Sequence, residues 1–285
     1  MDVDPQIAIC ILNGYPRASR ENFDRDGVGH PHNLFRDFLQ RYLPSATVDV
    51  FFVADTDQDL PSGTALTSYN GFIWTGSDLT IYDRSDQRVT RQIALARAIF
   101  ACGVPMYGSC WGVQMAAVVA GGEVAKNPKG REWGLARDIT LTADGRQSPL
   151  MAGKPEHFDG FIMHLDEVTR LPPGATLLAV NAHTRVQALE VRQGQGVFWA
   201  TQYHPEYNFL EMGRLIAARA KPLVNEGFFE REEDVKTHAG RMMALHRDPR
   251  EENLRAALAV GEDILDPSIR EQELRNWIDH LVLTG

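Results

Sequence analysis

Cysteine is scarce in this chain of 285 residues, which contains only Cys10, Cys102 and Cys110. An odd number of cysteines without any C-x-x-C spacing argues against a disulfide framework and against a structural zinc site. Cys10 lies in the apolar run 7–12 and is expected in the core, and Cys102, near a predicted helix end, is also expected to be structural. Cys110 alone lies between glycines that are close in sequence.

Long apolar runs and a basic leader are also missing. No run approaches the roughly 18 apolar residues of a membrane-spanning helix. The first ten residues, MDVDPQIAIC, carry acids and no basic region, which is unlike a secretory signal peptide. The net charge of −9 disfavours binding to a nucleic-acid phosphate backbone. We therefore expect no membrane or nucleic-acid partner, and free thiols favour a cytoplasmic location.

No glycine-rich loop of the form G-x-x-x-x-G-K-[ST] occurs, so the chain holds no recognisable ATP-binding domain. Any synthetase that uses its product would be a separate polypeptide. Neither a metal site nor an organic cofactor is indicated, and none is expected. Apolar residues make up 44% of the chain, which at this length can form a core without such supports.

Short apolar runs alternate with helical spacing in the first part of the chain. Strands are predicted at 7–12, 47–53, 71–74 and 104–107, and helices at 33–42, 85–102 and 112–120. This alternation predicts an α/β fold with a parallel sheet covered by helices on both faces. The polar segment 17–30 predicts a long loop.

Shorter strands and then helices fill the rest of the chain. Strands are predicted at 123–125, 136–142, 161–163, 176–181, 186–191 and 197–202, with a hairpin turn at 194–196. Helices are predicted at 209–226, 231–245, 250–261 and 268–283. We predict a domain at 1–225 and a C-terminal helical appendage at 226–285.

Two apolar faces follow the helical period in this appendage. They consist of Leu254, Ala257, Leu258, Val260 and Ile264, and of Leu274, Trp277, Ile278, Leu281 and Val282. Packing on the domain and an interface with a partner or in a homodimer both remain open.

A G-x-C-x-G sequence, Gly108 to Gly112, lies between a short apolar strand and a helix. This context predicts a nucleophile elbow, in which a tight turn projects Cys110 over the sheet and both glycines allow close backbone approach. At a helix N-terminus the helix dipole favours a thiolate at Cys110. The N–H of Trp111 would face the same site.

His204 and Glu206 follow the apolar strand that ends near 202 and lie two residues apart, so an extended chain places both side chains on one side. A cysteine nucleophile needs an imidazole for proton transfer, and the imidazole needs a carboxylate to orient it. The pattern predicts a Cys110, His204, Glu206 triad. The acid follows the histidine directly, unlike the chain order of an α/β-hydrolase.

The combination of GSCWGVQ (108–114) and QYHPE (202–206) resembles the class I (triad) glutamine amidotransferase family, which includes the amidotransferase domain of GMP synthetase and stand-alone γ-glutamyl peptidases. The family motifs match Gly108, Cys110, Gly112 and Gln114, and His204, Pro205 and Glu206. Segment 70–83 resembles the family's oxyanion strand and loop, with Gly76 at the position of the second oxyanion N–H. Segment 162–181 resembles the S-H-G-D-x-V region beside the glutamine pocket. The resemblance covers roughly residues 5–225.

The resemblance implies a doubly wound, mostly parallel, flavodoxin-like sheet and attack of Cys110 on a γ-carboxamide through a γ-glutamyl thioester. It implies oxyanion stabilisation by the backbone of Gly76 and Trp111. It also places the substrate beside Gln114, His164, Leu165 and Asp166.

Several positions depart from the family pattern. Thr75 and Ser77 stand where a glycine and a proline are common, and Leu165 replaces a glycine beside the substrate. Trp111 is bulkier than usual after the nucleophile and is expected to narrow the site. The segment 13–33 is expected either to cover the pocket and bind a carboxylate or to be a solvated loop; its basic residues are Arg17, Arg20, Arg25, His30 and His32.

Three functions are compatible with these residues. The first is glutamine hydrolysis that supplies ammonia to a separate synthetase subunit, which the family label favours. The second is a stand-alone γ-glutamyl hydrolase or peptidase, towards which the pocket departures lean. The third is a non-catalytic regulatory module, against which the intact triad argues.

Overall fold

A nine-stranded sheet forms the centre of the molecule in the computed structural model, which describes residues 7–284. The strand order is β2-β1-β3-β4-β11-β10-β9-β6-β7. The first five strands in this order are parallel, with bounds β1 (Ala8–Asn13), β2 (Thr47–Phe52), β3 (Gly71–Trp74), β4 (Met106–Ser109) and β11 (Gly196–Thr201). The others pair antiparallel, namely β6 (Glu132–Leu141), β7 (His157–His164), β9 (Ala175–Val180) and β10 (Ala188–Gln193). The predicted α/β fold is confirmed, and its sheet is mixed.

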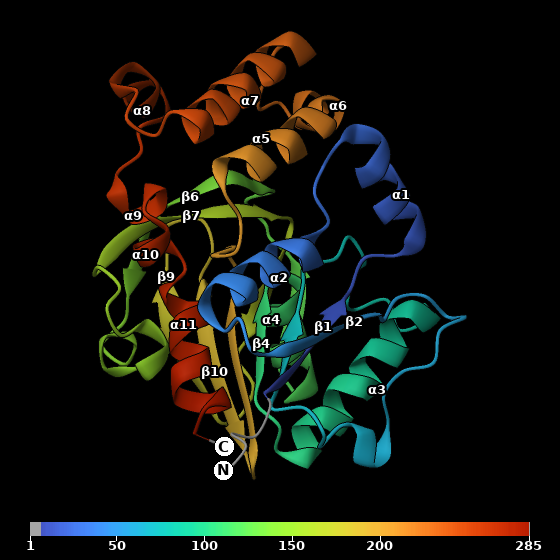
Figure 1. Ribbon diagram of the computed structural model, residues 1–285. Coiled ribbons are helices and arrows are strands. Elements are labelled where there is room, and N and C mark those ends of the chain that lie inside the picture. The colour runs from blue at the N-terminus through green and yellow to red at the C-terminus, as the bar shows by residue number, and fades with distance from the viewer. Residues whose placement is uncertain (1–6, 285) are drawn as a thin grey trace.

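Helices cover both faces of this sheet, as the sequence predicts (Figure 1). On one face, α3 (Gln87–Cys102) and α4 (Trp111–Val119) bury apolar side chains against the strands. On the other face lie α2 (Pro31–Tyr42) and α11 (Gln272–Trp277). Because the neighbouring parallel strands β1, β3, β4 and β11 end at one edge, the residues that follow them meet there.

Local capping explains where the longest of these helices begins and ends. The Asp86 side chain accepts a hydrogen bond from the Arg88 N–H and starts α3. Gly103 ends it with φ 77°, in the left-handed region. Cys102, in its last turn, is exposed, whereas Cys10 is buried in the core as expected.

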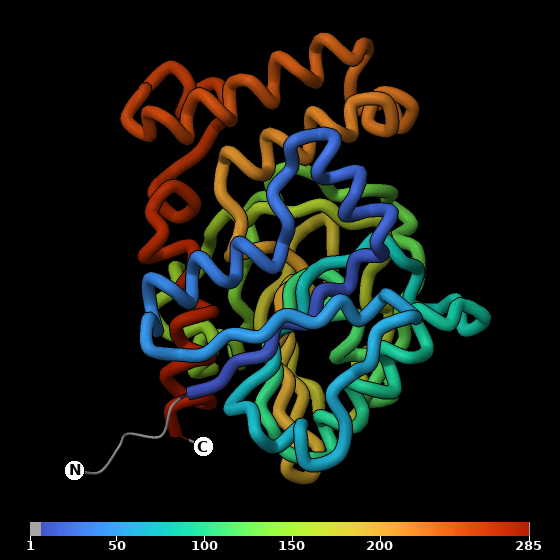
Figure 2. The backbone as a smooth tube through the Cα atoms, turned by 45° about the vertical axis from the view of Figure 1, so that its right-hand side comes forward, coloured from blue at the N-terminus to red at the C-terminus, as the bar shows by residue number. Residues whose placement is uncertain are grey.

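The segment predicted as a long loop contains a helix, α1 (Arg17–Asp26), so that prediction is wrong (Figure 2). Arg20 and Phe23 are its only buried residues. With one apolar side chain on the buried face, the segment lacks the apolar periodicity that identifies a helix in a sequence. Gly27, with φ 67°, ends the helix.

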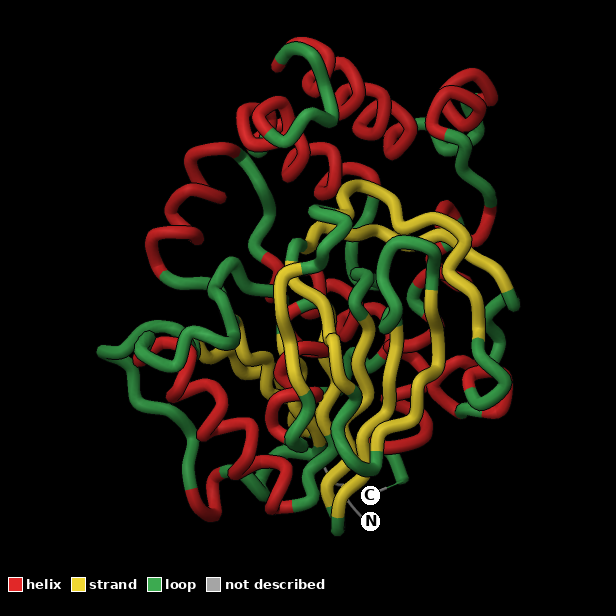
Figure 3. Tube along the Cα trace, turned by 180° about the vertical axis from the view of Figure 1, so that it is seen from behind, coloured by secondary structure: helices red, strands yellow, loops and turns green. Residues whose placement is uncertain are grey.

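The antiparallel half contains one strand that the sequence did not reveal, β8 (Asp166–Arg170), which pairs with β5 (Glu123–Lys126) in a separate small sheet. The predicted hairpin is present between β10 and β11, where Gln193 pairs with Gly196 and Gly194 has φ 58°. Figure 3 shows these strands from the opposite side of the molecule.

The chain after β11 is helical but more broken than predicted. The elements are α5 (Phe209–Ala218), α6 (Ala220–Asn225), α7 (Glu232–Arg247), α8 (Glu252–Leu258), α9 (Glu262–Leu265), α10 (Pro267–Arg270), α11 and a π-helical turn at Ile278–Val282. Within residues 7–284, no helix has the length and apolar character needed to cross a bilayer.

Both apolar faces of the C-terminal helices pack within the chain. Leu258 and Ile264 join a cluster with α5 and α7. Trp277 is fully buried in the cluster that contains β1 and β3, and a Cβ on Gly71 would lie 2.7 Å from its ring. Glu273 of α11 is buried too and accepts a hydrogen bond from the Tyr203 hydroxyl. The last helices therefore share the main core, and the domain division at residue 225 stays a prediction.

Candidate active site

Cys110 lies at the turn between β4 and α4 with φ 53° and ψ −92°. Such a conformation costs a residue with a side chain about 1–3 kcal/mol and needs support from its surroundings. The Cys110 N–H donates to the Thr201 carbonyl at the end of β11, 2.8 Å away, and its carbonyl accepts from the N–H of Val113. The turn that the G-x-C-x-G sequence predicts is therefore held from both sides.

The two glycines of the motif differ in how strictly the turn requires them. A Cβ on Gly108 would lie 2.6 Å from the Cα of Gly112, a contact that backbone atoms cannot relieve by rotation. A Cβ on Gly112 would lie 3.4 Å from the Cβ of Trp74, which is ordinary contact. The close approach of the Gly112 backbone therefore explains why position 108 requires glycine, whereas position 112 has room for a Cβ.

His204 and Glu206 lie just beyond β11, as predicted, and both are buried. The His204 Nδ1 donates to the Glu206 Oε1 over 2.7 Å. Burial alone would lower the pKa of His204, but the Glu206 carboxylate and the Cys110 side chain outweigh it and raise that pKa to about 10. The imidazole is therefore protonated at neutral pH and can act as an acid.

Ser109, which precedes Cys110, was not singled out by the sequence. Its Oγ donates to the Glu206 Oε1 over 2.8 Å, and the residue is fully buried. The other carboxylate oxygen of Glu206, Oε2, has no hydrogen-bond partner within residues 7–284. Ser109 thus supplies the second hydrogen bond that fixes the carboxylate. It occupies a variable position of the motif, so the pattern gave no signal for it.

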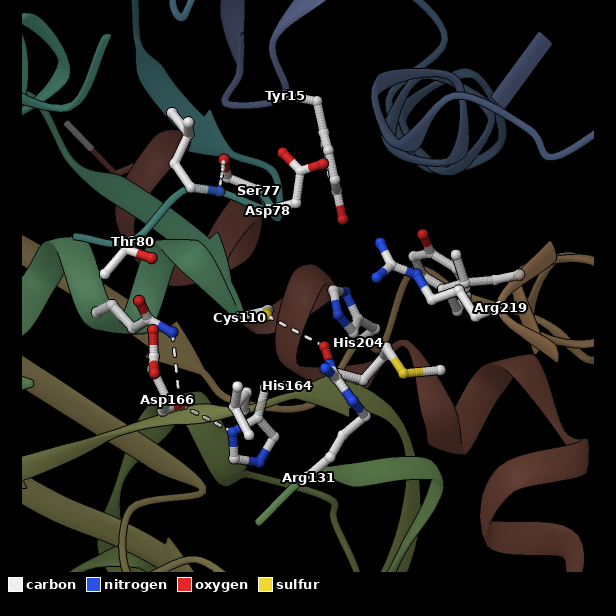
Figure 4. Close-up of a pocket in the computed structure, with 16 residues that line it drawn as sticks. Tyr15, Ser77, Asp78, Thr80, Cys110, Arg131, His164, Asp166, His204 and Arg219 are labelled. Atoms are coloured by element: carbon white, nitrogen blue, oxygen red, sulfur yellow. Dashed lines mark hydrogen bonds between the residues drawn. The ribbon is translucent and has the colours of Figure 1, made fainter. Parts of the chain in front are cut away.

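A pocket of about 180 Å³ opens beside Cys110 and His204 (Figure 4). Its walls include all four predicted substrate-binding residues, Gln114, His164, Leu165 and Asp166. The volume is below the roughly 300–1,000 Å³ of sites for drug-sized ligands, so the pocket suits a small substrate.

Gln114 and Asp166 are in contact in the wall of this pocket. The Gln114 Nε2 donates to the Asp166 carbonyl at 3.5 Å, and the Gln114 Oε1 is buried without a partner in the described part of the chain. Burial raises the pKa of the Asp166 carboxyl group, which accepts a hydrogen bond from Tyr82 at 3.2 Å. An unused amide oxygen and a carboxyl group can together accept hydrogen bonds from an ammonium group.

His164 lines the pocket, but its ring nitrogens are already engaged. Nδ1 donates to the Asp166 carbonyl over 2.9 Å, and Nε2 contacts the buried Glu132 carboxylate over 3.0 Å. Burial opposes ionisation of Glu132, but its hydrogen bonds with His164, Asn181 and Thr184 lower its pKa. The geometry gives His164 the task of holding the Asp166 segment in place.

The loop after β3 brings Gly76 next to His204, since a Cβ on Gly76 would lie 3.4 Å from the His204 Cε1. Thr75 and Ser77 tie this loop to Gly14. The Thr75 Oγ1 accepts from the Gly14 N–H at 3.0 Å, and the Ser77 Oγ donates to the Gly14 carbonyl at 2.8 Å. These two departures from the family pattern therefore cross-link the loop to the end of β1.

Two expectations about neighbouring residues are wrong. The Trp111 side chain does not narrow the pocket, because it is buried beside α3, where its Nε1 donates to the Gln92 Oε1 at 3.0 Å. Of the two alternatives for segment 13–33, binding of a substrate carboxylate by its basic residues is wrong, because these residues do not line the pocket and have partners within the chain, although Tyr15 of the segment does line it. Arg17, Arg20, Arg25, His30 and His32 contact Asp57, Asp55, Asn22, Asp24 and Asn13, respectively.

Other pocket residues were missed by the sequence analysis, among them Tyr15, Arg131, Tyr207 and Arg219. The Tyr207 ring lies 4.7 Å from the His204 ring, and Tyr15 follows the end of β1. Tyr207 directly follows the His204–Glu206 motif and Tyr15 follows a predicted strand, so the sequence offered a signal for both. Arg131 and Arg219 have no such signal in the sequence, because only the fold brings these distant positions to the pocket. Within residues 7–284, no three His, Cys, Asp or Glu side chains are grouped as metal ligands.

Comparison with known proteins gives one consistent family. Residues 33–220 match the family described as glutamine amidotransferase class-I. The chain is 34% identical to a γ-glutamyl-L-1-hydroxyisopropylamide hydrolase from a Pseudomonas species, over 98% of this chain and 94% of that protein. It is 35% identical to a glutamine-hydrolysing GMP synthase from Nitrosomonas eutropha, over 52% of this chain and 28% of the synthase.

Solved structures share the fold at lower identity. A glutamine amidotransferase from Thermotoga maritima has a TM-score of 0.65 and 18% identity, covering 95% of this chain and 99% of that one. A glutamine amidotransferase from Methylobacillus flagellatus has a TM-score of 0.65 and 20% identity, covering 97% of this chain and 96% of that one. At these coverages the C-terminal helices are largely included in the similarity.

Proposed function

The chain belongs to the class I glutamine amidotransferase family, and within that family we propose that it is a stand-alone hydrolase of γ-glutamyl amides. The observation that carries this proposal is the match over nearly the full length of the chain to a hydrolase that acts on a γ-glutamyl amide. The comparisons favour this function over the supply of ammonia to a synthetase, which the sequence analysis placed first. The GMP synthase from Nitrosomonas eutropha aligns with only 52% of the chain.

The proposed reaction begins at the Cys110 thiolate. Its sulfur attacks the γ-carbonyl carbon, and the carbonyl oxygen becomes an oxyanion. The C–N bond then breaks as the His204 imidazolium gives its proton to the leaving amine. The products of this step are a γ-glutamyl thioester on Cys110, a neutral His204 and a free amine.

Water completes the cycle. Neutral His204 takes a proton from water as the oxygen attacks the thioester carbon, and the C–S bond breaks. Glutamate leaves, and the thiolate and imidazolium are restored together. Glu206 and Ser109 keep the imidazole oriented through both steps because their hydrogen bonds do not involve the reacting nitrogen.

The oxyanion is assigned to the backbone N–H groups of Gly76 and Trp111. Trp111 is the first residue of α4, so its N–H has no partner within the helix. Gly76 lies beside His204 and Tyr15. Two such donors stabilise the developing charge, and removing one typically costs about 10²–10³ in kcat.

The γ-glutamyl part is assigned to the wall that contains Gln114, Leu165 and Asp166. The free Oε1 of Gln114 and the carboxyl group of Asp166 are suited to the α-ammonium group of the substrate. Leu165, in place of a glycine, fills part of this wall with an apolar side chain.

The test is amine release by the purified protein alone. A γ-glutamyl alkylamide should be hydrolysed with a kcat/KM at least about tenfold above that for glutamine, equivalent to about 1.4 kcal/mol. Cys110→Ala should abolish the reaction. Turnover of glutamine only, and only after addition of a partner protein, would instead support ammonia supply to a synthetase, the second candidate, which the GMP synthase matches favour.

A further inference from the structure

We propose that Arg219 and Tyr15 form a subsite for the leaving amine, and that the preferred substrate is a γ-glutamyl amide whose amine part carries a carboxylate. This inference rests on the proposed function and names the substrate class of the same pocket. It concerns the wall opposite the one assigned to the glutamyl group.

Arg219 is a pocket cation without a carboxylate partner in the described part of the chain. It directly follows α5 and is partly buried. Arg131, the other pocket arginine, is committed elsewhere, since it binds both carboxylate oxygens of Glu226 at 2.7 and 2.9 Å. A buried or half-buried guanidinium normally has an anionic partner, so Arg219 has an unmet requirement that a ligand can satisfy.

The position of Arg219 relative to the triad indicates which part of a substrate it meets. In Figure 4, His204 lies between Cys110 and Arg219, while Asp166 and Thr80 lie on the other side of Cys110. His204 must reach the amide nitrogen to protonate it, so the amine leaves on the His204 side. The group attached to that nitrogen then extends towards Arg219, and the glutamyl group extends towards Asp166.

Tyr15 adds a neutral donor to the same region. The pKa of its hydroxyl is raised mainly by burial and to a smaller extent by the nearby Cys110, so the O–H is retained at neutral pH. The hydroxyl makes no hydrogen bond to another residue within 7–284 and points into the pocket beside the Arg219 guanidinium (Figure 4). A planar guanidinium with an adjacent hydroxyl suits a carboxylate, which accepts hydrogen bonds on both oxygens.

Two other acidic groups lie near this region, and neither one pairs with Arg219 within residues 7–284. Asp78, on the same wall as Tyr15, accepts a hydrogen bond from the Ser19 hydroxyl at 2.6 Å, and Glu226 is bound by Arg131. Neither forms an ion pair with Arg219 in the described residues. Asp166 therefore lies towards the position assigned to the glutamyl ammonium group, and Arg219 lies towards the position assigned to the amine part.

The experiment compares γ-glutamylglycine and γ-glutamyl-β-alanine with their C-terminal amides, which have the same shape without the charge. The wild-type protein should prefer each carboxylate over its amide by at least about tenfold in kcat/KM, as a charge-assisted hydrogen bond provides. In Arg219→Gln that ratio should fall at least about tenfold, and Tyr15→Phe should lower it about threefold. Lys221→Gln, which removes an exposed positive charge two residues away, should leave the ratio unchanged.

Because both substrates are measured on the same protein sample, the ratio of their kcat/KM values does not depend on how much of a variant is folded. An unchanged ratio in Arg219→Gln, or equal wild-type rates for acids and amides, would overturn the subsite. In that case the γ-glutamyl hydrolase assignment would still stand. Failure of the wild-type protein to release any amine would instead overturn both proposals.

Discussion

The Ser109 hydroxyl and the His204 Nδ1–H both donate hydrogen bonds to the same carboxylate oxygen of Glu206, Oε1, at 2.8 and 2.7 Å. The residue before Cys110 is thereby connected to the carboxylate that holds His204. The elbow and the strand end are joined by side chains as well as by the backbone bond from Cys110 to Thr201.

Removing this hydroxyl should slow the chemistry without weakening substrate binding. Ser109 is away from the pocket, so Ser109→Ala should leave KM within about twofold while kcat falls about tenfold, the value of a lost hydrogen bond to a charged group. Steady-state kinetics with a γ-glutamyl amide measure both. A rise in KM with an unchanged kcat would show that Ser109 acts on binding.

Glu206 should set the alkaline limit of activity. His204 must be protonated to release the amine, and its pKa is raised to about 10, so kcat should fall only above that pH. Glu206→Gln removes the anion, lowers the pKa of His204 and should move the alkaline limb to lower pH. A pH profile of kcat for both proteins measures the shift, and an identical limb in Glu206→Gln would contradict the assignment.

The same shift affects folding. A histidine pKa raised from about 6.5 stabilises the folded state fully below pH 6.5, and this contribution is lost as the pH rises through 10. Wild-type protein should therefore lose stability across this range relative to Glu206→Gln, as urea titrations at several pH values would show.

The two motif glycines should respond differently to alanine. Gly108→Ala places a Cβ 2.6 Å from the Gly112 Cα and should destabilise the protein by about 1–3 kcal/mol and distort the elbow. Gly112→Ala meets nothing closer than 3.4 Å and lies in a helix, so it should stay within about 1 kcal/mol of wild type. Chemical denaturation compares the two, and equal effects would show that the close approach is not what Gly108 provides.

Trp277 should be required for folding of the whole chain. It is fully buried against β3, so Trp277→Ala should lower the free energy of unfolding by about 3–5 kcal/mol. Leu283→Ala is the matched control, because Leu283 is 49% exposed and should change stability by less than about 0.5 kcal/mol. A stable Trp277→Ala protein would show that the last helices are a separable appendage, as the sequence predicted.

The sequence predicts best where chemistry and periodicity coincide. The β4 turn and the β11 end were found because Cys110 and His204, residue types suited to nucleophile and base, each follow an apolar run, and parallel strands bring such ends together. The helix α3 was found from its apolar spacing. These features are local, so one stretch of residues contains all the information.

Features that depend on distant contacts were missed. Helix α1 buries only Arg20 and Phe23, and the arginine is held by Asp55 from another part of the chain. Arg131 and Arg219 reach one pocket from positions without a common pattern. The expected narrowing by Trp111 was wrong because the side-chain direction depends on its bond to Gln92.

The proposed chemistry requires a covalent γ-glutamyl group on the Cys110 sulfur. Mass spectrometry of peptides from protein quenched in acid during turnover of a γ-glutamyl amide tests this directly. The expected result is the γ-glutamyl mass on the peptide that contains Cys110, and its loss in Cys110→Ala together with all amine release. Amine release that persists in Cys110→Ala, or an adduct on another residue, would contradict the mechanism.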